Sequence, residues 1–239
     1  MKKNIFYIAF IIAVSFTCCN FGGETVNGNG NLKNETRSVG NTSKIKVIGG
    51  MDVFIEPGLP AVKVQGDENI LRYVETRIDD GWLEIKTRDH VNIHSVNPVK
   101  VYITASEINA LKVTGSGNIT CNNKFSSGRD MSFSITGSGN ITAAVNTPGV
   151  NASITGSGNM YIKGETRNAD INITGSGNYN SPDLKAENAA VKISGSGDAN
   201  LFADVNLKAS IAGSGGIKYT GDAAVDKHIA GSGTIIKVP

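Results

Sequence analysis

The acidic residues that could cleave a glycosidic bond do not form a recurring pair in this 239-residue chain. Glycan cleavage needs two carboxylates, or a carboxylate beside Arg, Lys or Ca²⁺, held at a fixed separation. The acids of the C-terminal half stand at different positions relative to the tripeptide repeat described below: Asp170, Asp183, Asp198 and Asp204. We therefore identify no catalytic residue and expect a protein that is not an enzyme. A polysaccharide lyase or hydrolase is the alternative.

Histidine and cysteine are too sparse to indicate a metal centre. His90 and His94 lie four residues apart, which would place them on one face of a strand, but no third ligand accompanies them, and His228 stands alone. Cys121 has no disulfide partner in the body of the chain and no Cys-x-x-Cys spacing, so we interpret it as a packing residue. We expect no metal and no cofactor.

The tripeptide Gly-Ser-Gly dominates the second half of the chain. It occurs seven times between Gly115 and Gly233, and successive copies begin 22, 19, 19, 20, 18 and 18 residues apart. A nucleotide-binding loop needs a third glycine that opens a helix, or Gly-Lys-Ser/Thr, and neither follows any copy. None of the seven serines has an assigned base, as a nucleophile would require. Self-similarity at about 20 residues is typical of a solenoid.

Apolar and small polar residues alternate around each tripeptide. Two residues before the first glycine stands Val113 or, in every later copy, an isoleucine, while Ser, Thr and Asn fill the positions of opposite parity. A period of two with aliphatic residues on one face is typical of a half-buried β-strand. A repeat of 18 to 20 residues holds two or three short strands, which is one coil of a β-helix. We predict an all-β fold, a solenoid whose parallel coils stack about 4.8 Å apart.

Stacked coils would place equivalent outward side chains above one another. The predicted hydroxyl ladder contains Ser116, Ser138, Ser157, Ser176, Ser196, Ser214 and Ser232, and the flanking amide ladder contains Asn118, Asn140, Asn159 and Asn178. Asn amides in such a ladder can hydrogen-bond to one another. We interpret both ladders as structural, with weak multivalent binding as the alternative. The glycines either face inward or sit at a bend, and the pattern does not separate these two causes.

Residues 43–110 lack the tripeptide and are predicted to cap the repeat coils of residues 111–239. The predicted strands are 61–65, 73–78, 82–87 and 99–104, with a helical turn at 68–71 and a degenerate first copy of the repeat at 47–53. Asp79-Asp80-Gly81 predicts a hairpin between two of these strands. Solenoids need atypical terminal units to cover their open ends, and we expect Trp82 to pack within this cap.

The N-terminus has the features of an export signal. A positive start is followed by an apolar run over residues 5–16, which is too short to span a bilayer. We predict a signal peptide over residues 1–19, of lipoprotein type with lipid attached at Cys18 or Cys19. A simple signal peptide is the alternative. Residues 20–42 are predicted to be a flexible tether, and the lipid would anchor the protein to a membrane.

Several ordered motifs resemble the head GIN domain of auto-transporter adhesins. They are the Gly-Met-Asp-Val segment at residues 50–53, the Gln-Gly-Asp-Glu-Asn segment at 65–69 with the Asp-Asp-Gly hairpin, and the run of Ile-Thr-Gly-Ser-Gly-Asn units. The resemblance covers residues 43–236 and implies a right-handed single-stranded β-helix in a domain spanning 43–239. It also implies a Bacteroidetes lipoprotein or secreted protein that acts in adhesion, and it supplies no catalytic residues.

The expected partners follow from the charge and from this resemblance. The net charge is +2 and no block of Lys or Arg occurs, which excludes a typical nucleic-acid binder. We expect an exported protein that binds glycans or surface proteins. It would be an outer-membrane lipoprotein or a cell-surface protein, with a periplasm-facing position as the alternative. A purely structural envelope or oligomerisation module is a further alternative, and the sequence leaves the oligomeric state open.

Overall fold

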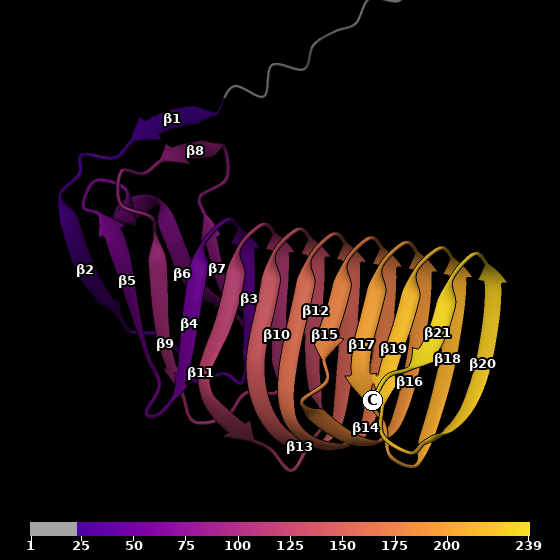
Figure 1. The fold of residues 1–239 in the computed structure, drawn as a ribbon. Coiled ribbons are helices and arrows are strands. Elements are labelled where there is room, and N and C mark those ends of the chain that lie inside the picture. Colours follow the sequence, from indigo (N-terminus) through magenta and orange to yellow (C-terminus); the bar gives the residue numbers. More distant parts are fainter. Residues whose placement is uncertain (1–22) are drawn as a thin grey trace, which may run out of the picture.

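The structure is a computed structural model that describes residues 23–239, which wind into a parallel β-solenoid (Figure 1). The predicted signal peptide, the predicted lipid attachment at Cys18 or Cys19, and the first residues of the expected tether lie outside the described residues. Within residues 23–239, no helix has the length and apolar character needed to cross a membrane.

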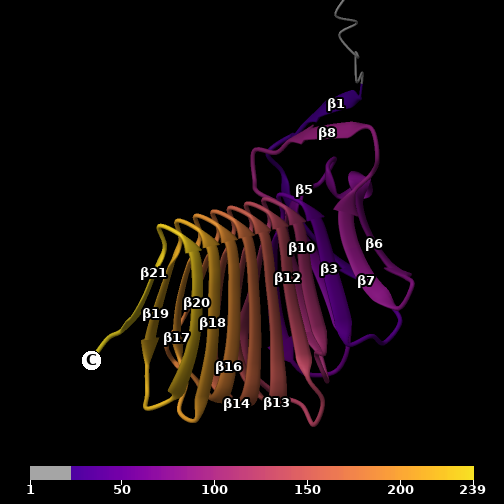
Figure 2. The ribbon, with the colours of Figure 1, turned by 90° about the vertical axis from the view of Figure 1, so that its right-hand side faces the viewer.

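Each coil contains two strand segments that meet at a Gly-Ser-Gly corner (Figures 1 and 2). We name the two long faces of the solenoid after one strand of each. The β16 face holds the segments that run into the corners: β3 (Lys44–Gly49), β10 (Ala110–Gly115), β12 (Met131–Gly137), the second halves of β13 (Asn140–Gly156) and β14 (Asn159–Gly175), β16 (Leu184–Gly195), β18 (Asn206–Gly213) and β20 (Ala224–Gly231). The β17 face holds the segments that leave them: β4 (Asp52–Pro57), β11 (Asn118–Ser126), the first halves of β13 and β14, β15 (Asn178–Ser181), β17 (Asp198–Phe202), β19 (Gly216–Thr220) and β21 (Thr234–Lys237).

The tripeptides of successive coils lie in register. The first glycine of each copy pairs with the first glycine of the next, from Gly115 through to Gly231, and every one of these pairings is parallel. Gly49 pairs with Gly115 in the same way, so the degenerate first copy predicted at residues 47–53 is confirmed. The predicted stack of coils is therefore correct.

The inward positions of the alternating pattern form one continuous apolar core. Val113 and the isoleucines that follow it are buried up to Ile211, and they form a column along the solenoid axis. Tyr179 occupies an inward position that isoleucine or methionine fills on earlier coils, and it is fully buried. Its neighbour one coil later is Ala199, whose small side chain leaves room for the larger ring.

The glycines of the tripeptide have two different structural causes. Gly175 has a φ of +115°, and a Cβ there would lie 2.5 Å from the carbonyl oxygen of Gly156 on the previous coil. Gly177 needs no positive φ, but a Cβ would lie 2.6 Å from the carbonyl oxygen of Gly158. The bend and the close approach, which the sequence could not separate, therefore both act at the first glycine, and close approach alone acts at the second.

The N-terminal strands cover the first coil. β7 (Trp82–Thr87) pairs with β3, and β9 (Lys100–Ala105) pairs with β4, both in parallel. β9 then pairs antiparallel with β5 (Ala61–Asp67), and β6 (Val74–Asp79) pairs antiparallel with β7. Asp80 and Gly81 both have positive φ, as the predicted two-residue hairpin requires. A single 3₁₀ turn at Leu71–Tyr73 follows close to the expected helical turn.

The expectation of a flexible tether over residues 20–42 is wrong for much of that segment. β1 (Glu24–Asn27) pairs with β8 (Val91–His94), and β2 (Leu32–Arg37) pairs antiparallel with β5 along its whole length. The physical reason is that β5 would otherwise present an unpaired edge. The Arg37 guanidinium also donates hydrogen bonds to the carbonyl oxygens of Leu71 and Val74, which ties β2 to the cap.

Buried Asp67 holds the loop after β8 in place. It accepts hydrogen bonds from the backbone N–H of Val96 (2.7 Å) and from the side-chain amide of Asn97 (2.6 Å). Burial acts to raise the pKa of Asp67, but these hydrogen bonds outweigh it and hold the pKa below its usual value. Trp82 is half-buried at the start of β7, and the Lys44 ammonium lies 5.9 Å from the centre of its ring.

The last described coil differs from the others at two inward positions. Lys227 on β20 pairs with Ala209, and Lys237 on β21 pairs with Tyr219, so two lysines take positions of inward parity. Both lysines are exposed, and Lys237 forms an ion pair with Asp222 at 3.0 Å. An inward-pointing charge on an edge strand is a known device against edge-to-edge pairing.

Candidate functional site

The seven tripeptide serines lie in a file along the corners, and all of them are exposed. They are Ser116, Ser138, Ser157, Ser176, Ser196, Ser214 and Ser232. Their backbone N–H groups join the coils, as where the N–H of Ser138 donates to the carbonyl oxygen of Gly115 at 2.9 Å. The hydroxyls point to solvent and do not bond to one another in the part of the chain that the structure describes. The row of serines is therefore a solvent-exposed edge of the solenoid.

The four predicted asparagines form a hydrogen-bonded row on the β17 face. The side-chain Nδ2 of Asn178, Asn159, Asn140 and Asn118 donates in each case to the side chain one coil earlier, at 2.9, 2.8, 2.7 and 2.7 Å. The final acceptor is the carboxylate of Asp52, so all the amide dipoles point the same way and end on a negative charge. The row continues at Asp198, whose Oδ1 accepts the backbone N–H of Gly216 at 2.8 Å.

Two more asparagine rows were not predicted. On the β16 face, Asn206 donates to Asn188 at 2.8 Å, and Asn188 donates to Asn168 at 3.2 Å. On the β17 face, Asn200 donates to Asn180 at 3.1 Å. A signal for them exists in the sequence, because the first row stands seven residues before the first glycine of its repeat and the second stands five residues after it.

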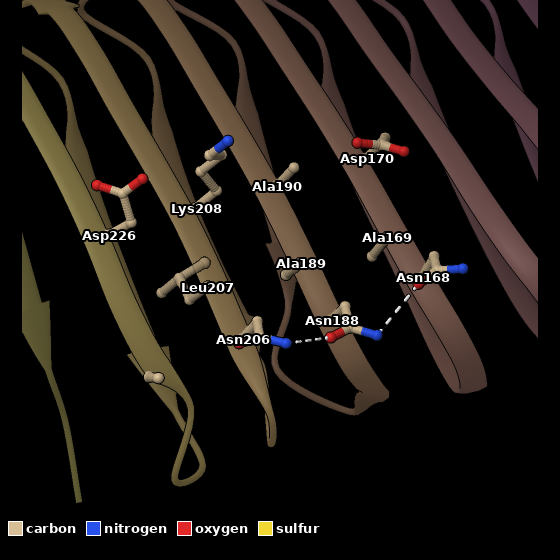
Figure 3. Close-up of a pocket in the computed structure, with 11 residues that line it drawn as sticks. Asn168, Ala169, Asp170, Asn188, Ala189, Ala190, Asn206, Leu207, Lys208 and Asp226 are labelled. Carbon is tan, nitrogen blue, oxygen red and sulfur yellow. Dashed lines mark hydrogen bonds between the residues drawn. The ribbon is translucent and has the colours of Figure 1, made fainter.

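A shallow groove of about 440 Å³ lies beside the first of these rows (Figure 3). We call it the Asn168 groove. It is bordered by the Asn168, Asn188 and Asn206 row and by a second outward row: Asp170, Ala190, Lys208 and Asp226. Ala190 has the shortest side chain of that second row, so the surface dips between Asp170 and Lys208. Within residues 23–239, neither the Asp170 carboxylate nor the Lys208 ammonium forms an ion pair.

A second groove, of about 460 Å³, opens on the β17 face. We call it the Tyr161 groove. Tyr161 on β14 forms one wall and Lys218 on β19 the other, and the Asn180 and Asn200 pair lies between them. Gly216 lines it without a side chain, beside the carboxylate of Asp198.

The other candidate chemical groups do not come together. In the part of the chain that the structure describes, no three His, Cys, Asp or Glu side chains lie close enough to hold a metal ion. His90 lies in the turn before β8 and His94 is the last residue of β8, whereas His228 is on β20. Asp183 and Asp204 lie in turns, away from the Asp170 and Asp198 side chains of the two grooves.

Cys121 and Tyr179, whose side chains lie in the apolar core, are unreactive. Burial raises the pKa of the Cys121 thiol to about 12, which keeps it protonated and non-nucleophilic at neutral pH. Burial also raises the pKa of the Tyr179 hydroxyl to about 12. The interpretation of Cys121 as a packing residue agrees with its burial in the core.

Comparison with known proteins places these features in a family. A family model described as "Putative auto-transporter adhesin, head GIN domain" matches residues 41–223. No curated protein matches the chain.

Several crystal structures share the fold. One, described as a putative lipid binding protein from Parabacteroides distasonis, is 26% identical, with a TM-score of 0.77, and the match covers 90% of this chain and 100% of that one. A putative adhesin from the same organism is 27% identical over the same coverage, with a TM-score of 0.73. A putative adhesin from Bacteroides fragilis has a TM-score of 0.82 at 21% identity, covering 89% and 100%, and supports the fold alone.

Proposed function

We propose that this chain, which belongs to the "Putative auto-transporter adhesin, head GIN domain" family, is a non-enzymatic adhesion module of the cell envelope that binds a glycan or a protein on its solenoid surface. The observation that carries the proposal is the set of asparagine rows on both faces. Hydrogen bonds between coils hold these amides in place before any partner arrives, so little side-chain freedom is lost on binding. Repeated, weakly binding groups at fixed spacing suit multivalent attachment.

We also propose that a lipid attaches the protein to a membrane at the end where β1 lies. β1 lies at the capped end of the solenoid, and β20 and β21 lie at the opposite end (Figure 1). A lipid on Cys18 or Cys19 would therefore hold the capped end near a membrane and leave both grooves on the coils further along. Mass spectrometry of the mature N-terminus tests this, because a diacylated or triacylated cysteine is expected and an unmodified N-terminus would refute the lipid anchor.

The alternative function is that of a polysaccharide lyase or hydrolase, since the Asn168 groove holds two carboxylates and a lysine. Asp170 and Asp226 lie three coils apart in register, which corresponds to roughly 14 Å. Glycoside hydrolysis requires carboxylates about 5 to 9.5 Å apart. The spacing favours binding over cleavage.

A glycan panel distinguishes these functions. The protein is incubated with immobilised and soluble polysaccharides and with envelope proteins, and both retention and new chain ends are measured. Retention without release of reducing or unsaturated ends is the expected result. Release of such ends would establish the enzyme. Retention by neither glycans nor proteins would favour a purely structural module.

A further inference from the structure

We propose that the Tyr161 groove is the binding site for an uncharged pyranose oligosaccharide that lies along the solenoid axis. This names the partner class of the adhesion function proposed above and rests on it. The groove is separate from the Asn168 groove, which lies on the opposite β16 face.

One wall of the Tyr161 groove is a free aromatic ring. Tyr161 is 41% exposed and occupies an outward position that Thr142 fills on the previous coil. The other outward aromatic residues of this face are already engaged. Phe54 on β4 stacks on Tyr102 of the neighbouring β9 with ring centres 5.4 Å apart, and the Lys185 ammonium lies 4.2 Å from the centre of the Phe202 ring on β17. Tyr161 makes no stacking or cation–π contact within the described residues. An exposed ring of this kind presents an apolar face that suits the C–H face of a pyranose.

Polar groups with unused hydrogen-bonding capacity lie between the two walls of the groove. Asn178 is the last asparagine of its row, before Asp198, and its Oδ1 accepts no hydrogen bond within residues 23–239. In the Asn180 and Asn200 pair, the Nδ2 of Asn180 and the Oδ1 of Asn200 are the groups not used by their mutual bond. The second carboxylate oxygen of Asp198 likewise accepts no hydrogen bond from the described part of the chain. Sugar hydroxyls both donate and accept, and the groove offers both kinds of partner.

The size and charge of the groove also match a short, uncharged sugar chain. Tyr161 and Lys218 are three coils apart, roughly 14 Å, which suits a di- or trisaccharide. The volume of about 460 Å³ is within the range of small-molecule sites. Asp198 and Lys218 carry opposite charges, so the groove attracts neither a polyanion nor a polycation strongly. An uncharged sugar chain is the chemistry that matches.

Saturation-transfer NMR and calorimetry on the purified protein test this, with uncharged hexose and N-acetylhexosamine di-, tri- and tetrasaccharides as probes. We expect at least one probe to bind, Tyr161→Ala to weaken it at least tenfold, and Tyr161→Phe to stay within about threefold of wild type because the ring face is kept. Phe54→Ala is the matched control, since its ring is already stacked on Tyr102, and it should leave affinity unchanged. Circular dichroism confirms that each variant is folded.

Three results would overturn the site. They are the absence of binding by every probe, binding that Tyr161→Ala leaves unchanged, and preferential binding of acidic polysaccharides. A surface-retention assay separates this failure from failure of the proposed function. If the wild type is retained on an envelope surface and Tyr161→Ala is retained equally, adhesion stands and the saccharide site is wrong. If the wild type is retained on no surface, adhesion itself is wrong.

Discussion

Replacing Gly175 by alanine tests the geometry on which the coil stack depends. The φ of +115° costs a non-glycine residue about 1–3 kcal/mol. The new Cβ would lie 2.5 Å from the Gly156 carbonyl oxygen, whereas real Cβ contacts essentially never fall below 3.0 Å. The coils must therefore separate locally by at least 0.5 Å, which stretches the 2.9 Å bond from the Ser176 N–H to that same oxygen. Losing this bond costs about 1–3 kcal/mol more, so we expect about 2–6 kcal/mol of destabilisation in total.

Urea denaturation followed by circular dichroism measures the effect, and three further alanine variants divide it into its causes. Gly49 has a φ of +105° and open space around it, so it reports the strain alone. Gly177 reports the close approach alone, and Gly128, which has neither, should stay within about 0.5 kcal/mol of wild type. If Gly175→Ala were no less stable than Gly128→Ala, the contact between glycines would not hold the stack together.

Three other perturbations have defined outcomes. Asn159→Ala removes two amide hydrogen bonds of 2.8 and 2.9 Å and should destabilise the protein by about 1–2 kcal/mol in urea denaturation. Asn151→Ala, at an exposed position, should change stability by less than about 0.5 kcal/mol. Equal effects of the two variants would contradict a stabilising asparagine row. The thiol of Cys121 should resist iodoacetamide until the protein unfolds. Its pKa of about 12 in the folded state lies above the ordinary 9.0, so the wild type should lose more stability than Cys121→Val as the pH rises above about 9. Identical dependence of stability on pH in the two proteins would refute this. Combining Lys227→Ile with Lys237→Ile should cause end-to-end association in sedimentation velocity, while Lys163→Ile on an outward position should not; a monomeric double variant would show that these charges do not protect the end.

The fold could be predicted from the sequence because local pattern and long-range packing agree in the repeats. The alternation around each tripeptide assigns every side chain to the core or to solvent, and the recurring glycines set which residues stack. The position of Asp198 was open to the same reasoning, since it follows Gly195 by three residues as Asn178 follows Gly175. Equivalent positions in a solenoid are neighbours in space.

The parts that could not be predicted depend on contacts between segments of different kinds. Apart from Leu32, residues 32–37 are polar, and the segment is mostly exposed, so only the free edge of β5 makes it a strand. The Tyr161 groove arises because small side chains at Asn180 and Asn200 separate two long ones, at Tyr161 and Lys218, on successive coils. No single repeat contains that pattern, and it becomes visible only when the outward positions are aligned across coils.

The hydrogen bonds that join one coil to the next run along the long axis of the molecule, and this determines how the protein responds to mechanical load. Tension between a membrane-attached capped end and the β21 end would act on these bonds in series, so the coils should peel away one after another. The last repeat interval of 18 residues would release a contour length of roughly 60 Å. Single-molecule pulling should show evenly spaced rupture events, and one abrupt rupture of the whole domain would contradict this. A protein that extends in such steps dissipates a sudden pull gradually, which protects a weak bond at its surface.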